Sequence, residues 1–171
     1  MEERVILVNE KDEQVGLMPK MEAHEKGLLH RAFSVFLFNT EGELLLQQRA
    51  LGKYHSPGLW TNTCCSHQRD GESSLEAGKR RLEEEMGINC ELQEAFSFMY
   101  RAAFDNGLTE HELDHVLVGT YTGDPRPDPR EVEDFKWLTI EELKADMERH
   151  PEKYTAWFKI IFKEYEERLL V

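Results

Sequence analysis

Two apolar runs separated by a short turn constrain the fold more than any other feature of this sequence. Residues 32–39 form a nearly continuous apolar run, residues 43–49 form another, and the turn Thr40-Glu41-Gly42 lies between them. Such runs predict strands, and the turn predicts that the two strands pair as a hairpin. Because a hairpin makes an antiparallel pair, we expect an α+β fold with a mixed sheet rather than a doubly wound parallel sheet.

Helix signals alternate with strand signals along the rest of the chain. Ser73 and Glu76 form a capping-box pattern before a helix that Gly87 ends, and Thr139 and Glu142 form a second such pattern. The apolar stripe expected on the first of these helices consists of Leu75, Leu82 and Met86. The other expected elements are strands at 4–10, 91–100, 111–121 and 135–138, and helices at 19–26, 140–149 and 156–169.

Length and charge limit the organisation of the chain and its partners. Its 171 residues suit a single domain, with an N-terminal extension over about 1–31, a core over about 32–150 and a C-terminal helix at about 156–169. The 21 lysines and arginines against 34 aspartates and glutamates give a formal net charge of −13. This acidity disfavours nucleic-acid binding, so an anionic ligand would need local basic side chains or metal ions. We expect a monomer or weak dimer.

The sequence also predicts a cytoplasmic protein. Its apolar stretches fall far short of the roughly 18 residues that a membrane span needs, so we expect no membrane partner. The N-terminal residues lack the pattern of an export signal. The three cysteines (Cys64, Cys65 and Cys90) are an odd number without framework spacing, which suits a reducing compartment.

Two groups of residues before position 70 have side chains suited to chemistry. His24 and His30 can converge if one lies on a helix and the other at the start of the next strand, although two unrelated histidines would have the same spacing. In an extended segment Cys65 and His67 share one face, whereas Cys64 points to the other. This second pair fits a nucleophile with its base, two metal ligands, or a buried thiol beside a surface histidine.

A third group alternates along a strand. Alternation places Glu110 and Glu112 on one face, with Asp114 continuing the row, and His111 on the other face. A solvated strand edge would explain this acidic row, but carboxylates leading into the apolar residues 116–118 are costly to bury unless they share a cation or proton. Combined with the histidines, they form a nitrogen and oxygen ligand set suited to Zn²⁺, Mn²⁺ or Mg²⁺.

Several ordered motifs connect the chain with one known family. They are W-T-N-x-x-C-x-H at residues 60–67, Y-R-A at 100–102, the E-x-E pair, and a degenerate form of the helix signature G-x5-E-x7-R-E-U-x-E-E-x-G-U. In that signature Ser66 takes the first glycine position, Glu72 the first glutamate, and residues 80–88 the remainder. With these motifs, effectively the whole chain resembles the type I isopentenyl diphosphate isomerases of the Nudix-fold superfamily, which implies a Nudix-like mixed sheet flanked by helices.

The sequence departs from the family patterns at two positions. Arg81 stands where the diphosphate-hydrolysing relatives carry a metal-binding glutamate, which weakens the case for a hydrolytic metal cluster. Gln68 stands where many relatives have proline after the motif histidine.

The resemblance implies two metal sites and a diphosphate site. One divalent metal (Mn, Zn or Mg) would be held by His24, His30, His67, Glu110 and Glu112. A Mg²⁺ bridging the substrate diphosphate would be held by Glu85 and the carbonyl of Cys65. The positions where this family binds phosphates are Lys20, Arg49, Lys53 and Arg81.

The implied reaction interconverts isopentenyl and dimethylallyl diphosphate, precursors of isoprenoids, through a tertiary carbocation. Glu112, polarised by its metal and by Tyr100, would deliver a proton, and Cys65 would act on the opposite face of the alkene. Trp157 would stabilise the cation with its ring, although core packing explains its spacing equally well. The histidines outside the matched set are His55, His111 and His115, and we expect their replacement to have smaller effects.

Two other functions compete with this interpretation. A Nudix-type diphosphohydrolase would need a full glutamate cluster on the helix and no cysteine, so Arg81 and Cys65 speak against it. An inactive Nudix scaffold that only binds ligands or proteins would lack part of the proton-transfer pair or of the metal set, and all of these residues are present.

Overall fold

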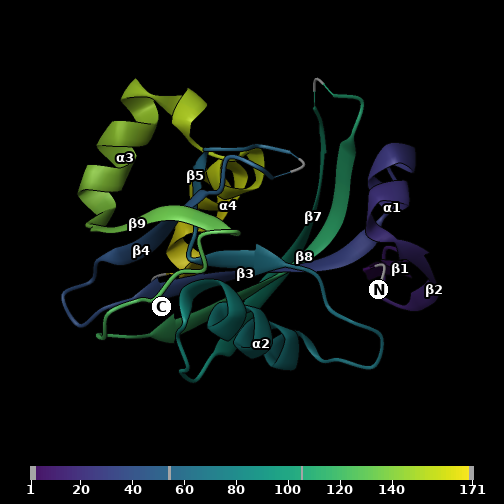
Figure 1. Cartoon of the computed structure of the whole chain (residues 1–171), viewed down its shortest axis with the longest axis horizontal. Helices are drawn as coiled ribbons and strands as arrows, with labels where there is room; N and C mark the ends of the chain where they lie inside the picture. Colours follow the sequence, from purple (N-terminus) through teal and green to yellow (C-terminus); the bar gives the residue numbers. More distant parts are fainter. Residues whose placement is uncertain (1–2, 54, 105, 170–171) are drawn as a thin grey trace.

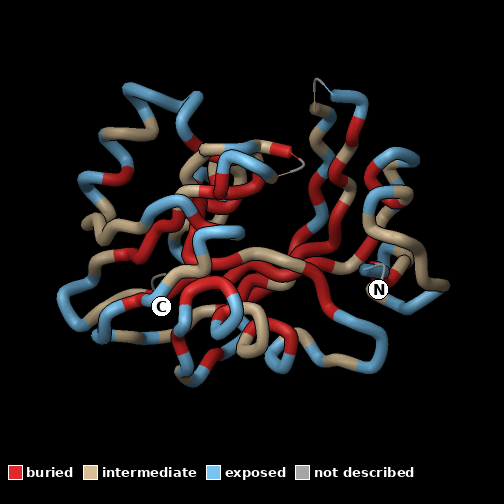
Figure 2. Tube along the Cα trace, in the orientation of Figure 1, coloured by how far each residue is buried: buried red, intermediate tan, exposed pale blue. Residues whose placement is uncertain are grey.

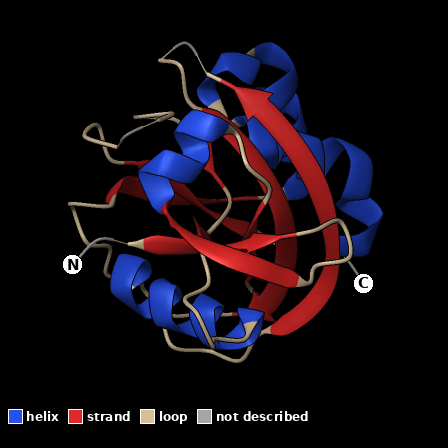
Figure 3. Ribbon diagram, turned by 90° about the vertical axis from the view of Figure 1, so that its right-hand side faces the viewer, coloured by secondary structure: helices blue, strands red, loops and turns tan. Residues whose placement is uncertain are grey.

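A nine-stranded mixed sheet with helices on both faces forms the centre of the structure (Figures 1 and 3). The computed structural model describes residues 3–53, 55–104 and 106–169. Its strands are β1 (Arg4–Val8), β2 (Gln14–Pro19), β3 (His30–Phe38), β4 (Leu44–Arg49), β5 (Trp60–Thr61), β6 (Cys64–Ser66), β7 (Gln93–Ala103), β8 (Thr109–Thr120) and β9 (Val132–Leu138). Its helices are α1 (Lys20–Lys26), α2 (Ser74–Met86), α3 (Ile140–Arg149), the 3₁₀ turn Pro151–Lys153 and α4 (Ala156–Leu169).

Strand β3 is the centre of the sheet. It pairs in parallel with β8 from His30 to Phe38 and antiparallel with the short β6. On the far side of β8 lies β7, and β1 joins β3 where Leu7 is opposite His30. The combination of parallel and antiparallel pairs confirms the expected α+β class with a mixed sheet.

The hairpin expected between residues 32–39 and 43–49 is confirmed only next to its turn. Strands β3 and β4 meet only where Phe38 is opposite Leu44. Beyond that point β3 is paired with β6 and β8, and β4 pairs instead with β9, from Leu44 opposite Leu138 to Arg49 opposite Val132. The turn residues therefore predicted the reversal of the chain correctly, but segments distant in the sequence determine which strands β3 and β4 pair with.

The helix boundaries follow the capping signals. The hydroxyl of Ser73 accepts a hydrogen bond from the backbone N–H of Glu76, and the backbone N–H of Ser73 donates to the carboxylate of Glu76. Thr139 and Glu142 do the same at the start of α3. Gly87 ends α2 in the left-handed conformation, at φ 65°. One member of the expected stripe is different: Leu75 is 38% exposed, and the buried positions of α2 are Ala77, Gly78, Leu82, Glu85 and Met86.

The N-terminal region contains a strand that the sequence pattern did not predict. The expected strand at 4–10 ends at Val8, and β2 returns antiparallel to it and leads directly into α1. Asn9 shapes the loop between them, since its side-chain oxygen accepts hydrogen bonds from the backbone of Lys11 and Glu13. This hairpin carries α1 to the edge of the sheet where β3 begins.

Two apolar cores lie on opposite faces of the sheet. Helix α2 covers one face, where Val35 and Leu82 pack in the core that includes Cys64. Helix α4 covers the other, where Phe36 packs with Trp157. Burial is continuous along the central strands and gives way to exposed residues in the loops (Figure 2). Within the part of the chain described, every helix is too short or too polar to cross a lipid bilayer.

Candidate active site and metal centre

The parallel register between β3 and β8 brings the first ligand pair together. His30 lies directly opposite Glu112, and Ala32 lies opposite Asp114. Glu110, Glu112 and Asp114 are all at most 5% exposed, so the acidic row is buried and the interpretation as a solvated strand edge is wrong. The expected alternation holds, because His111 is only partly buried.

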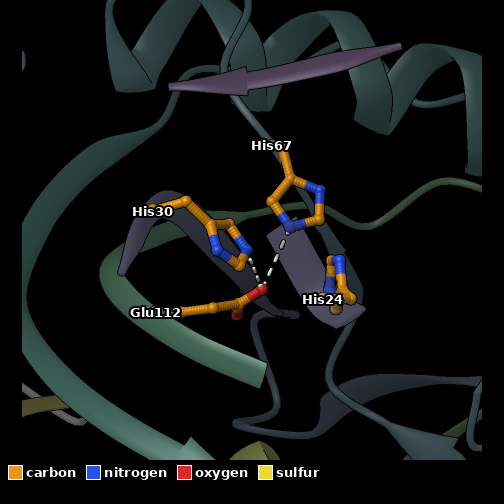
Figure 4. A group of neighbouring side chains, drawn as sticks. All are labelled: His24, His30, His67 and Glu112. Atoms are coloured by element: carbon orange, nitrogen blue, oxygen red, sulfur yellow. Dashed lines mark hydrogen bonds and ion pairs between the residues drawn. The ribbon is translucent and has the colours of Figure 1, made fainter. Parts of the chain in front are cut away.

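Three histidines from three different elements converge on Glu112 (Figure 4). His24 comes from α1, His30 begins β3, and His67 follows β6. The Nε2 atoms of His30 and His67 lie 3.1 and 3.0 Å from Oε2 of Glu112. One ligand atom from each of these four buried residues lies within 4.8 Å of every other, which is compatible with a shared metal ion.

Hydrogen bonds of the other ring nitrogens prepare these histidines to bind a metal. Nδ1 of His24 lies 2.7 Å from the carbonyl of Lys20, and Nδ1 of His30 lies 2.9 Å from that of Leu28. Because a carbonyl only accepts, each Nδ1 carries a proton, and Nε2 of the neutral ring presents a lone pair. A lone pair 3.1 Å from a carboxylate oxygen needs a proton or cation between them, so this donor set fits a divalent metal.

Glu110 lies at the edge of this group rather than inside it. Its Oε1 accepts a hydrogen bond of 2.5 Å from the hydroxyl of Tyr100, which also donates to Oε1 of Glu112 at 2.9 Å. Its Oε2 lies 3.9 Å from Nε2 of His24 and 2.9 Å from Nε2 of His55. Glu110 thus forms a second possible ligand group with His24 and His55.

His55 is the residue at the site that sequence reasoning missed. It lies in the loop between β4 and β5, is 3% exposed, and stacks on Phe104 with the ring centroids 4.8 Å apart. His55 lies outside the family motifs and matches no ligand spacing. The only indication of its role in the sequence was the density of reactive residue types in its loop.

Burial shifts the pKa values of the ionisable groups of the site. Desolvation lowers the pKa of His24 from 6.5 to about 4 and also lowers that of His67. Burial raises the pKa of the Cys65 thiol and of the Tyr100 hydroxyl, so both keep their protons at neutral pH. Burial alone would raise the pKa of Glu112, but in the metal-free protein the two neighbouring imidazoles, when protonated, lower it well below its usual value.

A small cavity joins the proton-transfer candidates. Cys65, Glu112 and Trp157 are among the residues lining about 30 Å³ of space next to the histidines. Cys64 points into the core on the other side of the sheet, so the predicted division of the two cysteines is correct. Trp157 is 2% exposed and belongs to the α4 core, so its ring both packs in the core and lines the cavity.

A second cavity, of about 80 Å³, is lined by basic residues and adjoins the first. Cys65 and His67 line it together with all four expected phosphate contacts, Lys20, Arg49, Lys53 and Arg81. Carboxylates also line this space: Glu3 lies 2.9 Å from the ammonium of Lys20, and Glu131 lies 2.6 Å from that of Lys53. The buried Arg49 lines both cavities.

Glu85 and Gln68 lie just outside these cavities. Glu85 is buried, and its two oxygens accept hydrogen bonds from Gln47 at 3.0 Å and from Arg81 at 2.8 Å. The amide of Gln68 donates to the carbonyl of Ala32 and to the hydroxyl of Ser74, at 3.0 Å each. Gln68 therefore ties the segment after His67 to both β3 and α2.

Residues 28–158 match the NUDIX domain family. The "Isopentenyl-diphosphate Delta-isomerase 2" of Aromatoleum aromaticum is 54% identical over 92% of this chain and 83% of its own length. The "Isopentenyl-diphosphate Delta-isomerase" of Serratia proteamaculans is 51% identical over 96% of this chain and 92% of its own.

Solved structures share the fold. A crystal structure of a Deinococcus radiodurans protein matches with a TM-score of 0.77 and 22% identity, over 95% of this chain and 99% of that one. A MutT protein from Methanosarcina mazei Go1 matches with a TM-score of 0.68 and 19% identity, over 81% and 94% of the two chains. These likenesses concern the fold alone, and they agree with the fold class described above.

Proposed function

The chain belongs to the Nudix domain family and, within it, to the isopentenyl-diphosphate Delta-isomerases, and we propose that it interconverts isopentenyl and dimethylallyl diphosphate. The single observation that carries this proposal is the placement of Cys65 and Glu112. The two residues come from β6 and β8, which flank β3 on either side, and they line one cavity.

The reaction needs a proton donor and a base at the two ends of a three-carbon unit, with water kept out. We assign proton delivery to Glu112 with Tyr100, whose hydroxyl donates to Oε1 of Glu112 at 2.9 Å. Cys65 acts on the other face of the alkene as the partner of Glu112, so that when one of the two groups gives a proton to one end of the three-carbon unit, the other, in its deprotonated form, removes a proton from the other end. A bound alkene that fills this space would displace the water that could trap the carbocation as an alcohol.

Trp157 supports the positive charge that develops between these two groups. Its indole lines the same cavity and is fixed by a hydrogen bond of 3.3 Å from Nε1 to the side chain of Asn62. An aromatic face attracts a cation, and a desolvated site strengthens that attraction. The guanidinium of Arg49 lies 5.3 Å from the ring centroid and connects the indole to the basic cavity.

Two metal ions complete the proposal. The residues that would hold the first, a divalent Mn, Zn or Mg ion, are His24, His30, His67, Glu110 and Glu112. Such an ion supplies positive charge that offsets the cost of burying two carboxylates. Glu85, with the carbonyl of Cys65, would hold a Mg²⁺ that supplies positive charge for the diphosphate, and Lys20, Arg49, Lys53 and Arg81 would bind the phosphate oxygens.

The alternative of a diphosphohydrolase is disfavoured by the pairing of Arg81. Its guanidinium donates to Glu85 at 2.8 Å and to Glu84 at 3.0 Å, so a cation stands among the carboxylates of α2. A hydrolytic cluster of metal ions needs a carboxylate at that position instead.

The proposed location is the cytoplasm, and the proposed ligand is a small prenyl diphosphate rather than nucleic acid or membrane. All three cysteines are free thiols, as a reducing compartment requires. The net charge of −13 repels nucleic acid, whereas the four basic residues of the cavity supply local attraction for a diphosphate.

The proposal is tested by incubating the protein with isopentenyl diphosphate and Mg²⁺ in D₂O. We expect proton NMR to show dimethylallyl diphosphate carrying deuterium at an allylic position, without release of phosphate. Phosphate release without an isomerised product would establish the hydrolase instead.

A further inference from the structure

His55 is a fourth imidazole beside the metal centre, and the mechanism above does not use it. Its Nε2 lies 2.9 Å from Oε2 of Glu110, closer than the 3.9 Å that separates this oxygen from Nε2 of His24. At 3% exposure it is as buried as Glu110 itself. The contact of this buried imidazole with Glu110, next to the other histidines, therefore needs a functional explanation.

The loop that carries His55 is held at several points. The backbone carbonyl of His55 accepts a hydrogen bond of 3.1 Å from Arg49, and its ring stacks on Phe104 at an interplanar angle of 8°. The edge of Trp157 meets the ring at 5.6 Å between centroids. One of these contacts holds the backbone of His55 and two hold its ring, so its approach to Glu110 is imposed by the fold rather than by a freely rotating side chain.

The two oxygens of Glu110 therefore have different partners. Tyr100 contacts Oε1 at 2.5 Å, and His55 contacts Oε2 at 2.9 Å. We propose that His55 is a positioning residue of the metal centre that, together with Tyr100, fixes the carboxylate of Glu110 in the orientation in which it binds the ion. This inference rests on the proposed metal centre and identifies a residue outside the family's ligand set. Outer contacts of this kind usually contribute 10- to 100-fold to metal affinity.

The test measures metal affinity rather than turnover. The Mn²⁺ dissociation constants of the full-length wild type, His55→Ala and His55→Gln are compared by chelator competition, with His150→Ala as a matched control on a half-exposed histidine distant from the site. We expect His55→Ala to weaken binding about 10- to 100-fold. His55→Gln should recover most of this loss, because its amide nitrogen can reach a similar position, and the control should bind as the wild type does.

A double-mutant cycle separates positioning from direct ligation. If His55 acts through Glu110, adding His55→Ala to Glu110→Gln should cause little further loss of affinity. Additive losses would show that His55 binds the ion independently and would overturn the proposal, as would unchanged affinity in His55→Ala. Thermal unfolding of the metal-free variants identifies any that fail to fold, and in that case His55→Gln decides. If the wild type binds no divalent ion, the metal centre itself is refuted, a different outcome from failure of the His55 role.

Discussion

His30 and Glu112 face each other across the parallel pair of β3 and β8, with Nε2 and Oε2 3.1 Å apart. This contact joins residues 82 positions apart in the sequence. Because parallel register determines which side chains are opposite, the candidate metal centre is built into the same pairing that forms the middle of the sheet. Loss of the centre should therefore affect both chemistry and stability.

Glu112→Gln should reduce both metal affinity and turnover, because in the proposed mechanism one carboxylate serves both the metal and the proton transfer. We expect the affinity for Mn²⁺ to fall at least about tenfold. The amide of glutamine keeps the shape of the side chain but lacks the negative charge of the carboxylate, which lies next to His30 and His67. Chelator competition and the isomerase assay measure the two losses separately. Full turnover in this variant would refute the dual role.

The adjacent cysteines should respond in opposite ways to replacement by alanine. Cys65→Ala should abolish turnover with little change in folding or metal content, because its thiol lines the cavity. Cys64→Ala should keep turnover but lower the free energy of unfolding by about 1 kcal/mol, because Cys64 is fully buried in the α2 core. Turnover and urea unfolding are measured on both. Substantial residual turnover in Cys65→Ala would remove it from the proton-transfer pair.

Glu131 should compete with the diphosphate for the basic cavity. Its Oε2 lies 2.6 Å from Lys53 and 3.4 Å from Arg81, where an anionic ligand would need to bind. Glu131→Gln should therefore bind Mg²⁺-free inorganic pyrophosphate up to about fivefold more tightly, the size of a partly exposed ion pair. Calorimetric titration measures this, with the exposed Glu133→Gln as control. Weaker binding in Glu131→Gln would mean that Glu131 holds the basic residues in place instead.

The sequence predicted the helices of this protein better than its sheet, and the grouping of the candidate ligands better than their surroundings. Capping boxes are local, so the starts of α2 and α3 could be read from four residues. The pairing of β4 with β9 depends on distant segments and could not. The family motifs indicated the histidines and glutamates, but the approach of His55 to Glu110 depends on how the loop after β4 folds over the site, which no spacing records.

Acid should destabilise the metal-free protein through His24. Burial lowers the pKa of this imidazole from 6.5 to about 4, so between these values the unfolded chain binds a proton that the folded one does not. The contribution of His24 to the free energy of unfolding thus has its full value above pH 6.5 and decreases by roughly 3 kcal/mol as the pH falls to about 4. Urea unfolding in EDTA at pH 7 and 5 should show a smaller loss for His24→Gln than for the wild type. Equal losses would mean that the other ionisable groups of the site govern the acid response.

Replacing Gly78 with alanine should destabilise the fold even though alanine favours helices. Gly78 lies where α2 presses against the sheet, and an added Cβ would come within 2.5 Å of Leu117 and 3.2 Å of Leu92. Overpacking of this kind usually costs 1–3 kcal/mol, against a gain of about 1 kcal/mol in helix propensity. We expect a net loss in the free energy of unfolding by urea. A higher free energy of unfolding would show that α2 can shift away from the sheet. Arg81 and Glu85, which α2 carries to the proposed diphosphate site, would then shift with it.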